Sequence, residues 1–139
     1  MNMNELADRL SQEGLNPDYY CIGAGWHRLG NGFALDFTGE KFEWFYVERG
    51  QKSQSDITFS SEAEACDYAY AALVQDKWAS SHLIGLFKTE TEAQDLIERL
   101  GQAAIKGDMD HIPYGGLGDL RHRVFVYGRD IYRFRDLMG

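Results

Sequence analysis

The sequence predicts an α+β fold in which about three helices pack on one mostly antiparallel sheet, a meander followed by a C-terminal hairpin. Three observations predict it: an aromatic strand pattern at 42–47, two helical segments that open with the same capping sequence, and paired strand patterns near the C-terminal end. Because such helices and strands each carry an apolar face, we expect them to pack in layers around one core.

The size and composition are those of a single globular domain, 1–139. The 139 residues can bury a core without disulfides or a structural metal, and 44% of them are hydrophobic while 26% are charged. No apolar run has the length of a membrane span, and Met1–Glu5 lacks the basic and apolar parts of a signal peptide. We therefore expect a cytoplasmic domain that makes no membrane contact.

A first helix is predicted from Met3 to Glu13. Asn2 and Glu5 form a capping box at its start, and Gly14 ends it. Two leucines at helical spacing would face the core: Leu6 and Leu10.

Three strands follow the first helix and are expected to form an antiparallel meander. They are predicted at 19–22, 33–37 and 41–48, with glycine-containing turns between them. Alternation in the second places Phe33, Leu35 and Phe37 on one face. The third carries large side chains on both faces, which predicts a central strand: Phe42, Trp44 and Tyr46 on one, Phe45 and Val47 on the other.

The segment 49–55 is polar and predicts a flexible loop, in which Gly50 permits a positive φ. A short strand is expected to follow it at 56–59.

An internal repeat then predicts strand, cap and helix twice, at 59–68 and 87–96. Ser61 and Thr89 are the expected N-caps, and Glu64 and Glu92 lie three residues later, as in capping boxes. Gly101 is expected to end the second helix. Each helix has an apolar stripe: Ala65, Cys66, Ala69 and Leu73 in the first, and Ala93, Leu96, Ile97 and Leu100 in the second.

The C-terminal part begins with a stretch of little periodicity, 102–120, which predicts a long loop of the kind that often carries function. Strand patterns at 121–127 and 130–134, joined by a Gly128-Arg129 turn, predict a hairpin.

The net charge of −8 disfavours nucleic acid, because binding to phosphates depends on lysine and arginine. A basic partner is favoured instead. The two cysteines, Cys21 and Cys66, can pair in principle, but without an export signal they are expected to be reduced core thiols.

The sequence contains residues that suit four kinds of site. A metal site at Asp108, Asp110, His111 and Asp119 has the wrong spacing for a calcium loop. Catalysis would use the histidines or cysteines, yet no nucleophile motif accompanies them, so we expect no enzyme. The histidines in question are His27, His82, His111 and His122. The glycine runs 23–25 and 115–118 do not join a strand to a helix as phosphate loops do, so we expect no cofactor.

Protein binding is the fourth kind, through exposed aromatic and charged side chains that supply anchors and electrostatic steering. The candidate partner-binding residues are Trp26, Glu48, Asp108, Asp110, His111, Tyr114 and Asp119.

The run Trp44–Gly50, followed by Phe59–Glu62 and Ala65–Tyr68, resembles a family of small bacterial immunity proteins found beside polymorphic and contact-dependent growth-inhibition toxins. The resemblance covers roughly the first three quarters of the chain. It implies a monomeric cytosolic antidote that binds its cognate, basic toxin domain and blocks the active site or the substrate path. A small-molecule-binding or adaptor domain of unknown ligand is the alternative.

Overall fold

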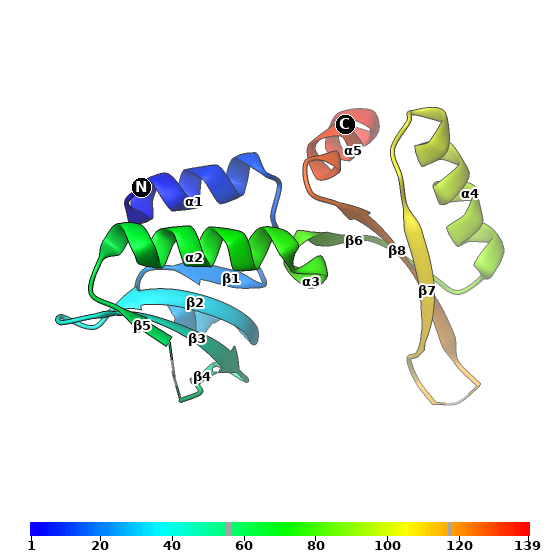
Figure 1. Cartoon of the computed structure of the whole chain (residues 1–139). Helices are drawn as coiled ribbons and strands as arrows, with labels where there is room; N and C mark the ends of the chain where they lie inside the picture. Colours follow the sequence, from blue (N-terminus) through cyan, green and yellow to red (C-terminus); the bar gives the residue numbers. More distant parts are fainter. Residues whose placement is uncertain (55–56, 117) are drawn as a thin grey trace. The chain divides into compact units, whose positions relative to one another are not determined.

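The computed structural model describes residues 1–54, 57–116 and 118–139. The chain divides into two compact units, Met1–Ser80 and Ser81–Gly139, each with its own sheet and core (Figure 1). The α+β class with mainly antiparallel pairing is confirmed. The described residues form two sheets and five α-helices, however, where one sheet and about three helices were predicted. The prediction of a single domain over 1–139 stays a prediction.

The first sheet is built around one long strand. Its strands are β1 (Tyr20–Ile22), β2 (Asn31–Phe37), β3 (Phe42–Glu48), β4 (Gln51–Lys52) and β5 (Ile57–Phe59). β3 pairs with β2 along one edge and with β4 and β5 along the other, so it is central, as predicted.

The prediction of an antiparallel meander was wrong at its first strand, because β1 runs parallel to β2. A parallel neighbour needs a connection that returns the chain to its starting side, and the 3₁₀ helix η1 (Trp26–Arg28) lies in that connection. Arg28 ties it to the sheet, since its guanidinium donates to the carbonyl oxygens of Pro17 at 2.8 Å and Tyr20 at 3.0 Å.

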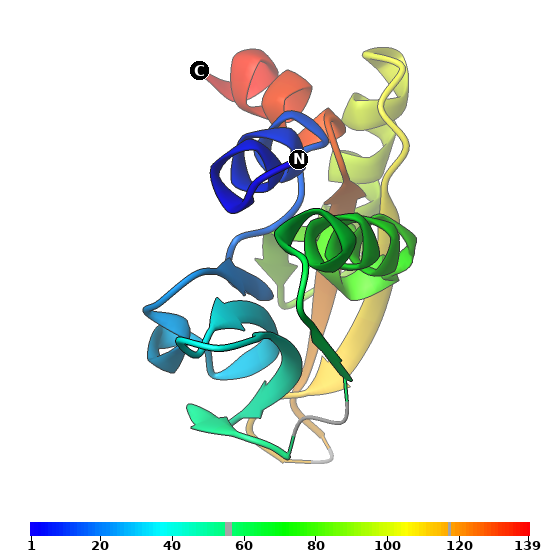
Figure 2. The same ribbon diagram turned by 60° about the vertical axis from the view of Figure 1, so that its left-hand side comes forward.

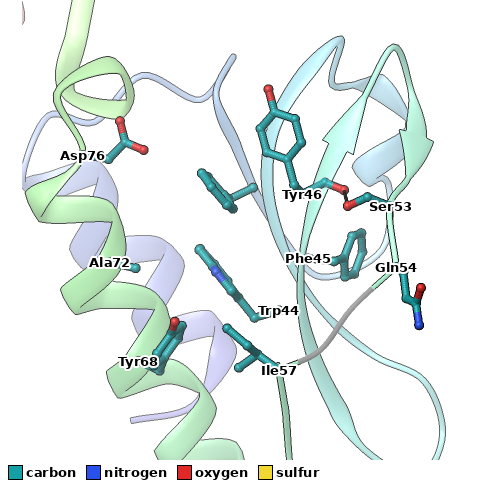
Figure 3. Close-up of a pocket in the computed structure, with 10 residues that line it drawn as sticks. Trp44, Phe45, Tyr46, Ser53, Gln54, Ile57, Tyr68, Ala72 and Asp76 are labelled. Carbon is teal, nitrogen blue, oxygen red and sulfur yellow. Dashed lines mark hydrogen bonds between the residues drawn. The ribbon is translucent and has the colours of Figure 1, made fainter.

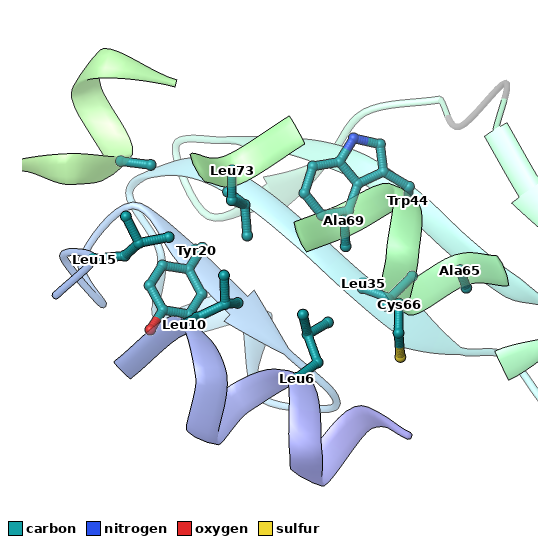
Figure 4. Packing of buried hydrophobic residues seen from close by; sticks show 11 residues of the cluster. Leu6, Leu10, Leu15, Tyr20, Leu35, Trp44, Ala65, Cys66, Ala69 and Leu73 are labelled. Atoms are coloured by element: carbon teal, nitrogen blue, oxygen red, sulfur yellow. The ribbon is translucent and has the colours of Figure 1, made fainter. Parts of the chain in front are cut away.

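Two helices cover one face of this sheet. α1 (Met3–Gln12) and α2 (Glu62–Gln75) lie side by side over it (Figures 1 and 2), and the short α3 (Lys77–Ser80) follows α2. The Asn2–Glu5 capping box is present, and Ser61 caps α2 as predicted. Figure 4 shows the core between helices and sheet: Leu6, Leu10, Leu15, Tyr20, Leu35, Trp44, Ala65, Cys66, Ala69 and Leu73.

A second cluster covers the opposite face of β3, which explains why both faces of this strand carry large apolar side chains. It contains Cys21, Leu29, Ala34, Phe45 and Val47, with Trp26 packed against it. Both cysteines are free and buried, and burial raises the pKa of each thiol. The two cysteines are therefore unpaired core residues, as expected, and their reduced state stays a prediction.

The turn between β3 and β4 has a positive φ at two consecutive residues, 52° at Arg49 and 77° at Gly50. A two-residue hairpin turn with this backbone matches the twist of the strands it joins. The predicted loop at 49–55 was therefore wrong at Gln51–Lys52, which pair with β3. Ser55 and Asp56, the last loop residue and the first residue of the predicted short strand, lie outside the described residues.

We expect Gly50→Val to destabilise the fold by about 1–2 kcal/mol, because a β-branched residue is strained at a φ of 77°. The nearest atom to the added Cβ would be the His27 carbonyl oxygen at 3.5 Å, an ordinary contact, so backbone strain dominates. Arg49→Gly is the matched control at φ 52° and should leave stability equal or higher. Urea denaturation would measure both, and an unchanged Gly50→Val midpoint would contradict this account of the turn.

The second unit is a three-stranded antiparallel sheet covered on one face by helices. Its strands are β6 (Ser81–Phe87), β7 (Asp108–Pro113) and β8 (Leu120–Tyr127), in the order β6-β8-β7. α4 (Glu90–Gln102) begins at the predicted cap Thr89 but runs one residue past Gly101. The buried core consists of Ala93, Leu96, Leu100, Ile105, Val124, Val126 and Ile131.

The predicted long loop at 102–120 was wrong, because Asp108–Pro113 forms a strand against β8. Only Met109 and Ile112 are large and apolar in that strand, so its sequence alternates weakly. Pairs of side chains across β7 and β8 support its position, and one of these pairs is the ion pair of Asp110 with Arg123.

The predicted C-terminal hairpin was also wrong, because Asp130–Met138 is the helix α5. Ile131 and Phe134, three residues apart, both pack into the second core, a spacing that suits a helix. Arg133 fixes the helix further by donating to Asp130 and to the carbonyl oxygen of Ala103.

Candidate functional site

Five of the seven predicted partner-binding residues lie on the β7–β8 hairpin, and their charges are largely paired within it. The Arg123 guanidinium donates to both oxygens of Asp110, from Nε at 2.8 Å and from Nη2 at 2.6 Å. Arg121 pairs with Asp119 and lies over the ring of Tyr114, 4.6 Å from its centroid. Asp110 and Asp119 therefore already face cations of their own hairpin. Tyr114 is well exposed.

His111 lies opposite His122 across the two strands, with ring centroids 6.0 Å apart. Within the described residues, no group of three or more histidine, cysteine, aspartate or glutamate side chains could hold a metal ion. Of the other two histidines, His27 stacks on Trp26, and His82 is buried on β6.

Asp108 is exposed at the start of β7, and it contributes to a raised pKa of Tyr127. Burial, followed by hydrogen bonding to Asp108 and its negative charge, raises the pKa of Tyr127 to about 12. Asp110 adds a smaller repulsion in the same direction.

This pKa predicts a loss of stability at alkaline pH. The folded protein keeps the Tyr127 proton up to about pH 12, whereas an unfolded tyrosine releases it from about pH 10. The contribution is therefore complete below pH 10 and is lost as the pH rises toward 12. Urea denaturation at pH 9 and pH 11 should show a smaller loss for Tyr127→Phe than for the unmodified chain. An equal loss in both would contradict the raised pKa.

Trp26 and Glu48, the remaining predicted residues, belong to the first unit. Trp26 is half-buried: it stacks on His27 at 3.7 Å between ring centroids and meets Phe45 edge-on at 5.3 Å. It thus forms part of the packing beneath the sheet. Glu48 is exposed at the end of β3, beside the turn at Arg49.

A groove in the first unit, which sequence reasoning missed, lies beside exposed aromatic residues. It consists of two hollows of about 400 and 340 Å³ between the α2–α3 segment and strands β2 and β3. Figure 3 shows the first of them. Three residues line both hollows and make them continuous: Phe33, Tyr46 and Asp76. We call this feature the aromatic groove.

Interlocked rings form its floor and walls. Phe33 stacks on Trp44 with ring centroids 5.3 Å apart and nearly parallel planes, and Tyr46 meets Phe33 edge-on at 5.1 Å. Tyr68, from α2, contacts Trp44 edge-on at 6.1 Å. Such pairs stabilise the arrangement of the rings. At its rim the exposed fractions are 38% for Tyr46, 41% for Tyr68 and 52% for Trp78.

Asp76 contributes the charge of the groove. It ends α2, and its Oδ1 accepts hydrogen bonds from the backbone N–H groups of Trp78 at 2.9 Å and Ala79 at 3.3 Å. That cap fixes the carboxylate near Tyr46, where the two hollows meet. Among the described residues that line the groove, Asp76 alone carries a charge.

The acidity of the chain is concentrated in the unit that holds the groove. Residues 1–80 contain 13 acidic and 6 basic side chains, a net charge of −7, out of −8 for the whole chain. The remaining −1 falls on residues 81–139, where 9 acidic and 8 basic side chains nearly balance. A basic partner would therefore be attracted mainly to the first unit.

Comparison of the chain with protein-family models, with curated proteins and with solved structures returned no match. Through the part of the chain that the structure describes, no helix combines the length and the apolar character that crossing a bilayer requires.

Proposed function

We propose that this chain is an immunity protein that binds a cognate, basic toxin domain and blocks its active site or substrate path. One observation carries the proposal: an aromatic groove, with a carboxylate where its two hollows meet, lies in a unit of net charge −7. Tyrosine and tryptophan are the side chains that most often anchor protein interfaces, and an acidic surface accelerates association with a basic one. The resemblance of Trp44–Gly50 and the following helix to immunity proteins supports the same function.

Co-purification tests the proposal. The tagged chain is co-expressed with the C-terminal domain of the protein encoded immediately upstream, with that domain expressed alone as the control. We expect a one-to-one complex in which the toxicity of the domain is suppressed, and an association rate that falls as salt is added. A domain that remains toxic and unbound would overturn the proposal. A thermal shift with a metabolite in that case would favour the small-molecule alternative.

The hairpin acids would add to this attraction, and a charge reversal measures how much. We expect Asp108→Lys combined with Asp110→Lys to slow association with the toxin domain, because it leaves Arg123 beside added positive charge. The control is Asp95→Lys with Glu98→Lys on exposed positions of α4, which changes the net charge equally. Stopped-flow association at several salt concentrations compares the two. Equal rates would place the interface away from the hairpin.

A further inference from the structure

We propose that the aromatic groove is an arginine-binding site, which takes the side chain of an arginine presented by the protein partner. This inference rests on the proposed function, since it names the group of the partner that enters the first unit. The ligand is a guanidinium carried by a polypeptide, and Asp76 is the group that pairs with it.

The charge of the groove selects a cation. Oδ1 of Asp76 is engaged as the cap of α3, and among the described residues no hydrogen bond to Oδ2 is formed. The carboxylate is therefore held in a fixed orientation with one oxygen able to accept from a ligand. The surrounding unit, at −7, adds a favourable long-range field for any basic segment.

The walls select arginine over other cations. An arginine side chain combines a methylene stem, which can lie along apolar surface, with a planar guanidinium that stacks on aromatic faces and is weakly hydrated. The ammonium of lysine is strongly hydrated and loses more on entering such a groove. Cations lie over aromatic rings elsewhere in this chain: Arg9 is 4.3 Å from the centroid of Tyr70, Arg123 is 4.9 Å from that of Phe125, and the Lys52 ammonium is 4.5 Å from that of Phe45. The preference for arginine therefore rests on the weaker hydration and planar shape of its guanidinium.

The rim favours a polypeptide over a free amine. Tyr46, Tyr68 and Trp78 are exposed around the two hollows, so a backbone that carries the arginine would cover further apolar surface there. Aromatic side chains around a filled pocket are typical of the residues that dominate protein interfaces.

The test is an NMR titration of the full chain with the capped tripeptide acetyl-Gly-Arg-Gly-amide. The matched ligand is the same peptide with citrulline, which keeps the shape of arginine without its charge. The three indole N–H signals report the location, because Trp44 and Trp78 line the groove whereas Trp26 packs on the opposite face of the sheet.

We expect the arginine peptide to shift the Trp44 and Trp78 signals in a saturable manner while the Trp26 signal stays in place. The citrulline peptide should bind about tenfold more weakly, in line with the strength of a hydrogen bond to a charged group. Asp76→Asn is the matched variant, because asparagine keeps the Oδ1 acceptor of the cap and removes the charge. This variant should bind the arginine peptide about fivefold more weakly, or weaker still, and its melting temperature should be unchanged.

Equal affinity for the arginine and citrulline peptides, or equal affinity of Asp76→Asn and the unmodified chain, would overturn the inference. Failure of the proposed function gives a different result. If the arginine peptide binds as expected but the toxin domain is neither bound nor neutralised, the arginine site stands and the antidote function fails. If Asp76→Asn and Tyr46→Ala neutralise the toxin as well as the unmodified chain does, the antidote function stands and the groove is not its arginine site.

Discussion

Replacing Gly32 with alanine is expected to destabilise the first unit by about 3 kcal/mol, the upper end of what overpacking a well-packed core costs. The added Cβ would lie 2.4 Å from the carbonyl oxygen of Tyr19 and 2.7 Å from its carbonyl carbon. Both are backbone atoms, so no side-chain rotation can relieve the overlap. The same Tyr19 oxygen accepts a hydrogen bond from the Phe33 N–H at 3.0 Å, at the point where the parallel β1–β2 pairing begins.

Gly30→Ala is the matched control two residues earlier in the chain. No atom lies within 4 Å of the Cβ it would add, and Gly30 does not have a positive φ, so its effect should be within a few tenths of a kcal/mol. Thermal and urea denaturation of both variants would measure the difference. Similar midpoints would mean that Tyr19 and β2 are farther apart than in this structure. Because Gly32 also lines the aromatic groove, loss of this packing should weaken binding of the arginine peptide as well.

Features that depend on neighbouring residues of one helix or strand were predicted correctly from the sequence. The caps at Asn2, Ser61 and Thr89 follow from the short polar side chain that precedes an acidic first turn. The two-sided character of Phe42–Glu48 follows from large side chains on both faces, since each face must be covered. These features depend on a few neighbouring residues and the geometry of one helix or strand.

Contacts between segments that are far apart in the chain could not be predicted from local sequence patterns. The parallel β1–β2 pair depends on the path of η1, which Arg28 fixes through two carbonyl oxygens. β7 depends on its neighbour β8, because its own alternation is weak. α5 was misread because Asp130–Phe134 is short enough to fit a strand pattern, and only the core contact of Ile131 and Phe134 decides between the two.

The candidate site was missed for a related reason. Phe33 was predicted on one face of its strand, and Trp44 and Tyr46 on one face of the next strand, but apolar residues on the face of a sheet usually lie buried under a helix. Whether they do depends on where α2 ends, and it ends at Gln75 with Asp76 as its cap. The rings near that end therefore stay accessible beside a carboxylate, and Trp78 lies past the helix at their rim. The hairpin acids show the converse, because their charges are paired. Arg123 lies opposite Asp110 on the neighbouring strand, which the local sequence could not indicate, whereas Arg121 follows its partner Asp119 by two residues along the chain.

Leu35 and Phe37 were predicted to share one face of their strand, but the structure gives them very different burial. Leu35 is fully buried between the sheet and the helices, whereas Phe37 is 48% exposed at the end of the strand. Leu35→Ala should destabilise the fold by about 2–5 kcal/mol, through the lost apolar contact and the cavity left behind.

Phe37→Ala removes a larger side chain, but it should cost only about 1 kcal/mol, since what it mainly loses is the ring contact with Phe42, at 4.7 Å between centroids. Urea denaturation of the two variants would rank them. The larger loss at Phe37 would mean that β2 continues under the helices beyond Leu35, and the groove, which opens beside Phe33 on the same strand, would then have a different outline.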